Sequence, residues 1–473
     1  MNQLKLHRQK TVNITMNSLW IVVLSLICFV ISLYQILIGE SAIGMSFLIF
    51  TFIGIFTSGI LSGAKQPHMH NLLLLFFVNL FAYTLFSLLS YYPYLTTGQF
   101  FIYPDQYHFY EHGEKLGHFG SLSEIYRACF IDRIHLENEA AHFLHGSIAF
   151  FANKYFNGNS VLLQIIHTSF WGILIGLFIY KILHFYVPNA KAFKYSLLYS
   201  LLSPVFYYSP WILRDIHVAL LYSAGIYIMH TRFSVLRLTI LMLLAYITLE
   251  FRLQHGVFYV IFIGIYVFFR GKTHAYYRVI LPITLIVFVF SLSLIITALW
   301  PKIEFVFRNF QSYSSYTEAR VGEGFGAYLY TLPPGIKHFS IAIYSQISQF
   351  PPWVGIEKSE TFVQGLIGSI ELISSMFWSY VFLFLLLSMF WGEQRLPKLL
   401  LFLLVVAFIF LVSNTANMNI RRLVGIYPII YTAFVYVKET LPQKKKRQID
   451  VFTKTAYMLL VAIYLQLSIT NLT

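Results

Sequence analysis

Long apolar runs separated by short polar turns cover the chain from about residue 18 to residue 470. A run of about 20 apolar residues is long enough to cross the hydrocarbon core of a bilayer as a helix. The pattern predicts about 13 transmembrane helices, and because several runs are short the range is 11–14. The predicted spans are 18–38, 45–62, 71–91, 161–184, 195–212, 214–231, 236–250, 255–270, 279–299, 367–391, 398–413, 423–437 and 453–470.

Two segments between the spans are too long to be simple connections. The first covers residues 92–159 and the second covers 301–365. Residues 140–155 carry a weakly apolar helical pattern that is too short and too polar to cross a membrane. We expect this helix to lie along the membrane surface. The whole chain, 1–473, is then one integral membrane domain with two long extracytoplasmic loops and short interfacial helices.

The amino-acid composition also indicates an integral membrane protein. Of the 473 residues, 58% are hydrophobic and 11% are charged, whereas a soluble domain has about 25% charged residues. The two cysteines are too few for a disulfide framework. The sequence therefore predicts an all-α polytopic membrane protein.

The distribution of charge predicts how the chain is oriented. If the N-terminus is cytoplasmic, the inner segments hold 20 of the 33 basic residues but 3 of the 19 acidic ones. This excess of lysine and arginine is typical of cytoplasmic loops. We therefore expect a cytoplasmic N-terminus and an extracytoplasmic C-terminus. The net charge of +14 then follows from membrane orientation, and no nucleic-acid partner is expected.

One predicted span begins with two adjacent charges, Arg214 and Asp215, in the sequence YYSPWILRDIHVALL. A charge in the middle of a bilayer costs at least about 2.5–3.5 kcal/mol. Ser209 and Pro210 precede the pair and mark a helix start, which lies at the outer face in the predicted topology. A structural interpretation is available, because Asp215 complements the positive end of the helix dipole and Arg214 can extend toward the surface.

Three further groups of charged residues fall at the same predicted face. The sequence TLEFRLQHG forms one outer turn, NTANMNIRRLVGIYP forms another, and PDQYHFYEHGEKL opens the first long loop. Together the four groups predict a polar cavity that faces outward, in which carboxylates transfer protons and arginines bind phosphate. Their members are Asp105, Glu111, Arg214, Asp215, Glu250, Arg252, His255, Arg421 and Arg422.

These segments resemble bacterial membrane glycosyltransferases of the C-type fold (GT-C). The likeness is carried by the acidic opening of the first loop, by FANKYFNGNSVLLQIIHTSFWGILIGLFIYKIL, by LLYSLLSPVFYYSPWILRDIHVALL and by the arginines of the late loop. A looser likeness connects the chain to O-antigen and capsule polymerases. The resemblance implies a polyprenyl-phosphate-linked sugar as the donor and a glycan or lipid as the acceptor. By its position, Asp105 matches the acidic residue of the family's first outer loop.

The leading hypothesis is therefore a sugar transferase in the bacterial inner membrane, acting at the outer face. Asp105 is the expected general base, or it positions the acceptor hydroxyl, and Asp215 and Glu250 are expected to orient the arginines. The remaining members, Glu111 and His255, are expected to contact substrate. The arginines that would neutralise the departing lipid phosphate are Arg214, Arg252, Arg421 and Arg422.

Other functions remain open at this point. A polymerase of lipid-linked repeat units would use the same cavity chemistry, and a transporter (flippase) of lipid-linked glycan is the alternative from a different class. Transporters often contain internal repeats and charges in the middle of the membrane, and neither is evident in the sequence. The spacing of cysteine and histidine indicates no metal site, so no metal ligand is assigned, although a divalent metal stays open as a cofactor.

Overall fold

The computed structural model describes residues 15–63, 66–100, 105–132, 138–271, 329–347, 359–391, 395–414 and 420–470, with the single positions 282, 300, 304 and 308. This part of the chain forms helices and contains no strand. The all-α class is therefore confirmed. The predicted span 279–299 apart from residue 282, and most of the predicted second loop at 301–365, lie outside the described residues.

The N-terminal half is built around five helices that pack against one another. They are α1 (Thr15–Leu37), α2 (Ser41–Ser62), α3 (Gln66–Thr97), α7 (Val161–His184) and α8 (Asn189–Leu202). Almost every side chain of α7 is buried because neighbours surround the helix on all sides. Such an apolar helix belongs inside a bundle rather than on its surface. Ser160 begins it, since its hydroxyl accepts a hydrogen bond from the backbone N–H of Leu163.

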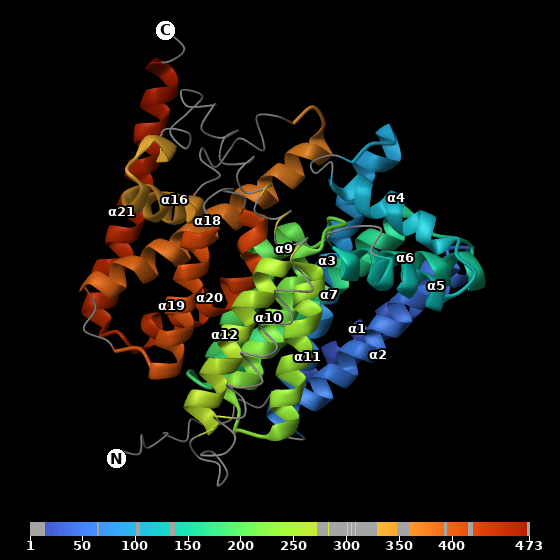
Figure 1. The fold of residues 1–473 in the computed structure, drawn as a ribbon, viewed down its shortest axis with the longest axis horizontal. Helices are drawn as coiled ribbons and strands as arrows, with labels where there is room; N and C mark the ends of the chain where they lie inside the picture. The colour runs from blue at the N-terminus through green and yellow to red at the C-terminus, as the bar shows by residue number, and fades with distance from the viewer. Residues whose placement is uncertain are drawn as a thin grey trace.

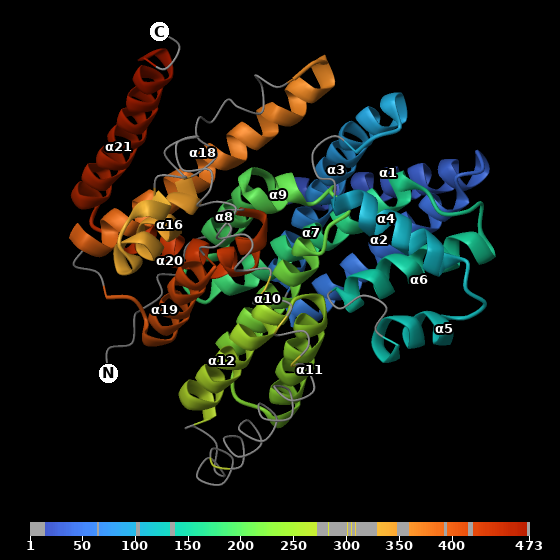
Figure 2. The same ribbon diagram turned by 45° about the horizontal axis from the view of Figure 1, so that its top comes forward.

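A second group of helices contains predicted spans from the middle of the chain and two of those from its C-terminal part. It comprises α10 (Asp215–His230), α11 (Val235–Phe251), α12 (Leu253–Arg270), α19 (Lys398–Ser413) and α20 (Tyr427–Thr440). In Figures 1 and 2, α10, α11 and α12 stand side by side between the N-terminal helices and the C-terminal ones. Helix α10 contacts α7, α11, α12 and α20, so it lies at the centre of the fold.

Three more helices complete the C-terminal side. They are α16 (Pro334–Ile347), α18 (Phe362–Trp391) and α21 (Gln443–Thr470). Helix α18 packs against α16, α20 and α21. Trp378 of α18 stacks on Tyr427 of α20 with the ring centroids 3.7 Å apart, and its indole N–H donates to Gln346 of α16. Burying the indole with a hydrogen-bond partner makes this junction specific.

The first long loop forms a compact group of short helices. It contains α4 (Asp105–Gly117), α5 (Leu122–Tyr126), a π-helix (Arg127–Ile131) and α6 (Glu139–Tyr155). Helices α4 and α6 pack closely because of Gly117, since a Cβ atom there would lie 2.5 Å from the Cβ atom of Ala149. The predicted helix near residues 140–155 is confirmed as α6. Its place along a membrane surface stays a prediction.

Five helices in the described part are long and apolar enough to cross a membrane: α2, α3 from His68 onward, α7, α12 and α18. Two shorter apolar stretches, Val23–Leu37 and Lys398–Ser413, accompany them. The chain is accordingly a membrane-embedded, all-helical protein. The number of thirteen spans and the orientation of the termini stay predictions.

The predicted continuous span 195–212 is not a single helix. Helix α8 ends at Leu202, Ser203 is extended, and a short α9 (Pro204–Tyr208) follows. Pro204 causes the break, because proline disfavours the helical conformation in the residue before it. The predicted span 423–437 differs as well, since it starts within a 3₁₀ helix, η4 (Ile420–Ile426), before α20 begins.

Candidate functional site

Asp215 and Arg252 form a buried ion pair. Asp215 is the first residue of α10, where its carboxylate complements the positive end of the helix dipole. Arg252 has an extended backbone between α11 and α12. The guanidinium Nη1 lies 2.8 Å from Oδ1 of Asp215, and the two side chains are 9% and 3% exposed. Both charges are therefore held inside the protein.

Arg421 connects this pair to a carboxylate at the surface. The side chain comes from η4, and its Nε lies 3.9 Å from Oδ2 of Asp215. Its Nη2 donates to Oδ2 of Asp105, the first residue of α4. Asp105 is 52% exposed, whereas Arg421 is 9% exposed. The ion pairs thus run from the protein interior to an accessible carboxylate.

Two more arginines surround the same carboxylate. Arg214 and Arg422 interact electrostatically with Asp215, as do Arg252 and Arg421. Arg214 also donates to the backbone carbonyl of Phe251 at 3.4 Å. Four guanidinium groups therefore accompany the two carboxylates. We call this group the arginine cluster; its members are Asp105, Arg214, Asp215, Arg252, Arg421 and Arg422.

Neighbouring hydrogen bonds fix the segments that carry the cluster. Gln106 is buried, and its Oε1 accepts from the backbone N–H of Ile212 at 3.1 Å, which ties α4 to the turn before α10. His255 donates from Nε2 to the carbonyl of Arg422 at 3.0 Å. Tyr222 donates to the carbonyl of His255 at 2.9 Å. His255, predicted to contact substrate, therefore positions the backbone of η4.

The two remaining predicted residues differ in their positions. Glu250 is buried in the last turn of α11, two residues before Arg252. Glu111 pairs with Lys115 one turn along α4, at 2.8 Å, and its side chain is 38% exposed. Within the described part of the chain, the ion pair of Glu111 does not join it to the arginine cluster. The ion pairs bring together Asp105, Asp215, Arg252 and Arg421 from four separate stretches of sequence.

A pair of buried histidines beside the cluster was not anticipated from the sequence. Gln164 donates from Nε2 to the carbonyl of His145 and to Asn159, so its Oε1 accepts from Nδ1 of His145 at 2.7 Å. Nε2 of His145 is then a buried acceptor, and its ring lies 6.0 Å from that of His217. Burial lowers the pKa of His145 to about 4, against the opposing effect of the Gln164 hydrogen bond.

The position of His217 explains why this pair belongs to the site. Its ring stacks on Phe251, with centroids 5.4 Å apart and an interplanar angle of 9°. Phe251 directly precedes Arg252 and accepts the hydrogen bond of Arg214. His145 and His217 are far apart in sequence, so only tertiary packing brings them together. The single local signal in the sequence is Gln164, which binds His145 and lies one helical turn after Ser160, the serine that caps α7.

An apolar pocket of about 460 Å³ lies between α2, α6 and α7. His167 is one of its few polar lining residues, and its Nδ1 accepts a hydrogen bond from Trp171 at 3.2 Å. Trp171 in turn contacts the ring of His217 at 6.1 Å. The pocket is therefore connected to the arginine cluster through successive ring contacts. Its apolar lining includes Ala42, Met45, Ile49, Phe50, Ile148, Phe151, Ala152 and Leu163.

Within the described ranges, no three histidine, cysteine, aspartate or glutamate side chains are arranged to hold a metal ion.

Comparison with known proteins finds no match: no family model, no curated protein and no solved structure is significantly similar to this chain. The resemblance to glycosyltransferases of the C-type fold therefore stays a prediction from the sequence.

Proposed function

We propose that the chain is a membrane glycosyltransferase. It transfers a sugar from a polyprenyl-phosphate carrier at the outer face of the bacterial inner membrane, in the assembly of a cell-surface polysaccharide or lipid glycan. The observation that carries the proposal is the line of ion pairs from buried Arg252 through Asp215 and Arg421 to the accessible Asp105.

The arginines suit the donor. A guanidinium group is planar, permanently charged and able to bind phosphate through two parallel hydrogen bonds. Asp215 lies among four of them and is itself almost fully buried, so it orients the arginines rather than reacting with substrate. A lipid phosphate that approached Arg421 would arrive next to Asp105, because the two side chains are hydrogen-bonded.

The chemical step then follows from the positions of the charged groups. The acceptor hydroxyl attacks the anomeric carbon, and the bond between that carbon and the phosphate oxygen breaks. Asp105 accepts the proton of the hydroxyl, and the departing polyprenyl phosphate keeps the bonding electron pair. Arginines that are already in place stabilise the negative charge that develops on the phosphate, which is the usual source of a large part of enzymatic catalysis.

The apolar pocket supports a lipid-linked donor. Its volume of about 460 Å³ is roughly three times the ~150 Å³ of a dry apolar cavity that binds benzene. It can therefore accommodate several isoprene units of a hydrocarbon tail. His167 and Trp171 lie between the pocket and His217, so a tail in the pocket would extend toward the arginine cluster.

Two other functions are consistent with parts of this arrangement. A polymerase that joins lipid-linked repeat units would use the same arginines and the same base. A flippase of lipid-linked glycan would use the arginines but would need no base, and the exposed position of Asp105 against Arg421 favours catalysis over transport.

Mass spectrometry of lipid-linked glycans from a deletion strain tests the proposal. A transferase predicts that the strain accumulates the sugar-charged polyprenyl phosphate and that its surface glycan lacks one sugar. A polymerase would instead leave single repeat units on the lipid. Unchanged lipid-linked glycans and an unchanged surface glycan would contradict the proposal.

A further inference from the structure

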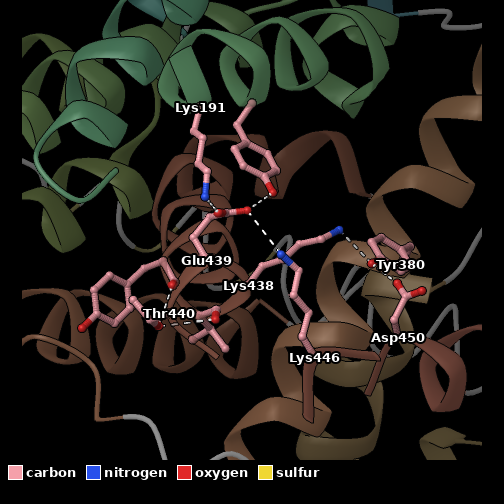
Figure 3. A network of polar contacts seen from close by, with 10 residues as sticks. Lys191, Tyr380, Lys438, Glu439, Thr440, Lys446 and Asp450 are labelled. Atoms are coloured by element: carbon pink, nitrogen blue, oxygen red, sulfur yellow. Dashed lines mark hydrogen bonds and ion pairs between the residues drawn. The ribbon is translucent and has the colours of Figure 1, made fainter. Parts of the chain in front are cut away.

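The start of α21 carries several basic residues that divide between two faces of the helix. Figure 3 shows the inward face, where Lys446 pairs with Glu439 at 3.5 Å and Asp450 accepts from Tyr380. Lys454 pairs with Asp450 at 2.7 Å. Residues 446, 450 and 454 follow one another at four-residue spacing, so they share one side of the helix.

These contacts belong to a larger set of polar interactions. Glu439 also accepts from Lys191 and Tyr195 of α8, and Lys438 donates to Tyr380 at 2.9 Å. The carboxylates on this side are therefore already matched with cations and hydroxyls. We call it the lysine network; its members are Lys191, Tyr195, Tyr380, Lys438, Glu439, Lys446 and Asp450.

The opposite side of α21 has cations without acidic partners among the described residues. Lys444 and Arg447 are exposed, and no ion pair is formed by either within this part of the chain. They line an open groove of about 770 Å³ together with exposed Val451 and Phe452. The remaining lining residues are Gln443 and Gln448. We call these six residues the basic face.

The position of these cations at the start of a helix adds to the positive potential of the basic face. Helix α21 begins at Gln443 and has no acidic residue in its first turn. Lysines there are unfavourable because the N-terminus of a helix already carries a partial positive charge. An anion at this position would interact favourably with both the backbone N–H groups and the cations.

The order of residues along the groove indicates which anion fits. Polar and basic positions, Lys444 and Arg447, come first, and the apolar side chains of Val451 and Phe452 follow one turn later. Phe452 also contacts Trp391 at the end of α18, with ring centroids 5.3 Å apart. Tryptophan is typical of the membrane interface, and arginine can lay its apolar stem along apolar surface while its charged end reaches water. The groove therefore matches a molecule with a phosphate at one end and a hydrocarbon chain at the other.

We propose that the basic face of α21 binds the headgroup of an anionic membrane phospholipid. Arg447 holds the phosphate through two hydrogen bonds, Lys444 adds a second positive charge, and Val451 and Phe452 pack against the first carbons of an acyl chain. The site is separate from the arginine cluster and does not depend on the transferase activity.

The test uses the full chain in nanodiscs of phosphatidylcholine, with or without phosphatidylglycerol. Native mass spectrometry counts the phosphatidylglycerol molecules that stay bound. The double variant Lys444→Gln/Arg447→Gln should retain several-fold less phosphatidylglycerol than the unmodified chain, and the loss should shrink as salt is raised. Both side chains are exposed, so the variant should keep its melting temperature in phosphatidylcholine alone.

Lys454→Gln is the matched control, because it removes one positive charge from the same helix on the side that faces the lysine network. It should retain phosphatidylglycerol as the unmodified chain does. Equal retention by the double variant, or an equal loss in Lys454→Gln, would overturn the proposal.

Inorganic phosphate added to phosphatidylcholine nanodiscs should not raise the melting temperature of the chain. A rise equal to that from phosphatidylglycerol would show that the site takes free phosphate instead.

Discussion

The arginine cluster and the lysine network are both groups of charged residues, but they differ in burial and in the type of cation. In the cluster, Asp215, Arg252 and Arg421 are each less than a tenth exposed. In the network, the side chains of Lys191 and Lys446 are 53% and 34% exposed, and tyrosine hydroxyls complete the hydrogen bonding of the carboxylates.

Burying a guanidinium and a carboxylate costs several kcal/mol, which their attraction repays only when the geometry is good. Exposed lysine pairs cost little and contribute little. The cluster joins the starts of α4 and α10 to the turn between α11 and α12, and the network joins the ends of α8, α20 and α21 to α18. This difference in burial is consistent with the proposed function of the cluster and with a packing role for the network.

The largest expected effect is that of Asp215→Ala. The change leaves Arg252 and Arg421 buried without their shared carboxylate, and breaking a buried pair in this way costs about 3–5 kcal/mol. We expect a sharp fall in membrane abundance and in the thermal stability of the purified chain. Stability equal to that of the unmodified chain would mean that water reaches these arginines.

Acidification should affect the region around the cluster through His145. The pKa of His145 is lowered to about 4 by burial, below the ordinary value of about 6.5. The stability that depends on its neutral form is complete above pH 6.5 and is lost as the pH falls toward 4, by up to about 3 kcal/mol. Thermal unfolding from pH 7 to pH 5 should show a smaller loss for His145→Gln than for the unmodified chain; equal losses would rule His145 out as the cause.

A smaller effect is expected from Arg214→Lys. Lysine keeps the positive charge but loses the planar fork that binds phosphate, so transfer activity should fall by about tenfold, or roughly 1.4 kcal/mol, with normal abundance. Arg127→Lys is the matched control, because Arg127 lies at the surface with its side chain 72% exposed. If Arg214→Lys complements a deletion strain as well as Arg127→Lys does, Arg214 has a structural role only.

The smallest effect is expected in the lysine network. Glu439→Gln keeps a hydrogen-bond acceptor for Tyr195 and removes the charge that attracts Lys191 and Lys446. Pairs with exposed lysines are worth about 1 kcal/mol or less. Abundance and transfer activity should both stay near normal. A loss of activity as large as that of Arg214→Lys would remove the distinction between the two regions.

Much of the helical framework could be predicted because apolar periodicity and length are local properties. Helices α2, α7, α12 and α19 match the predicted spans closely. The break at Pro204 and the 3₁₀ start before α20 were missed, because a run of apolar residues conceals a local change of backbone geometry.

The candidate site could be predicted in part, because some of its charged residues can be recognised from the local sequence alone. Asp105, Arg252 and Arg421 stand out as charges beside apolar runs, and a predicted topology is enough to group them. Gln106, His145 and His217 carry no such signal, since their roles depend on contacts between distant segments. Sequence patterns also cannot distinguish Glu111, which pairs along its own helix, from Asp105 at the start of that helix.

A comparison of two aspartate variants tests whether the arginine cluster with Asp105 catalyses sugar transfer. Asp105→Asn and Asp132→Asn are each expressed in the deletion strain, and lipid-linked glycans are measured together with membrane abundance. Asp132 is the matched control, a surface aspartate of the same loop that pairs with Arg127 at 3.6 Å. We predict that Asp105→Asn is as abundant as the unmodified chain yet loses about 100-fold or more of the transferred sugar, while Asp132→Asn restores it. Full transfer by Asp105→Asn would exclude Asp105 as the base of the reaction.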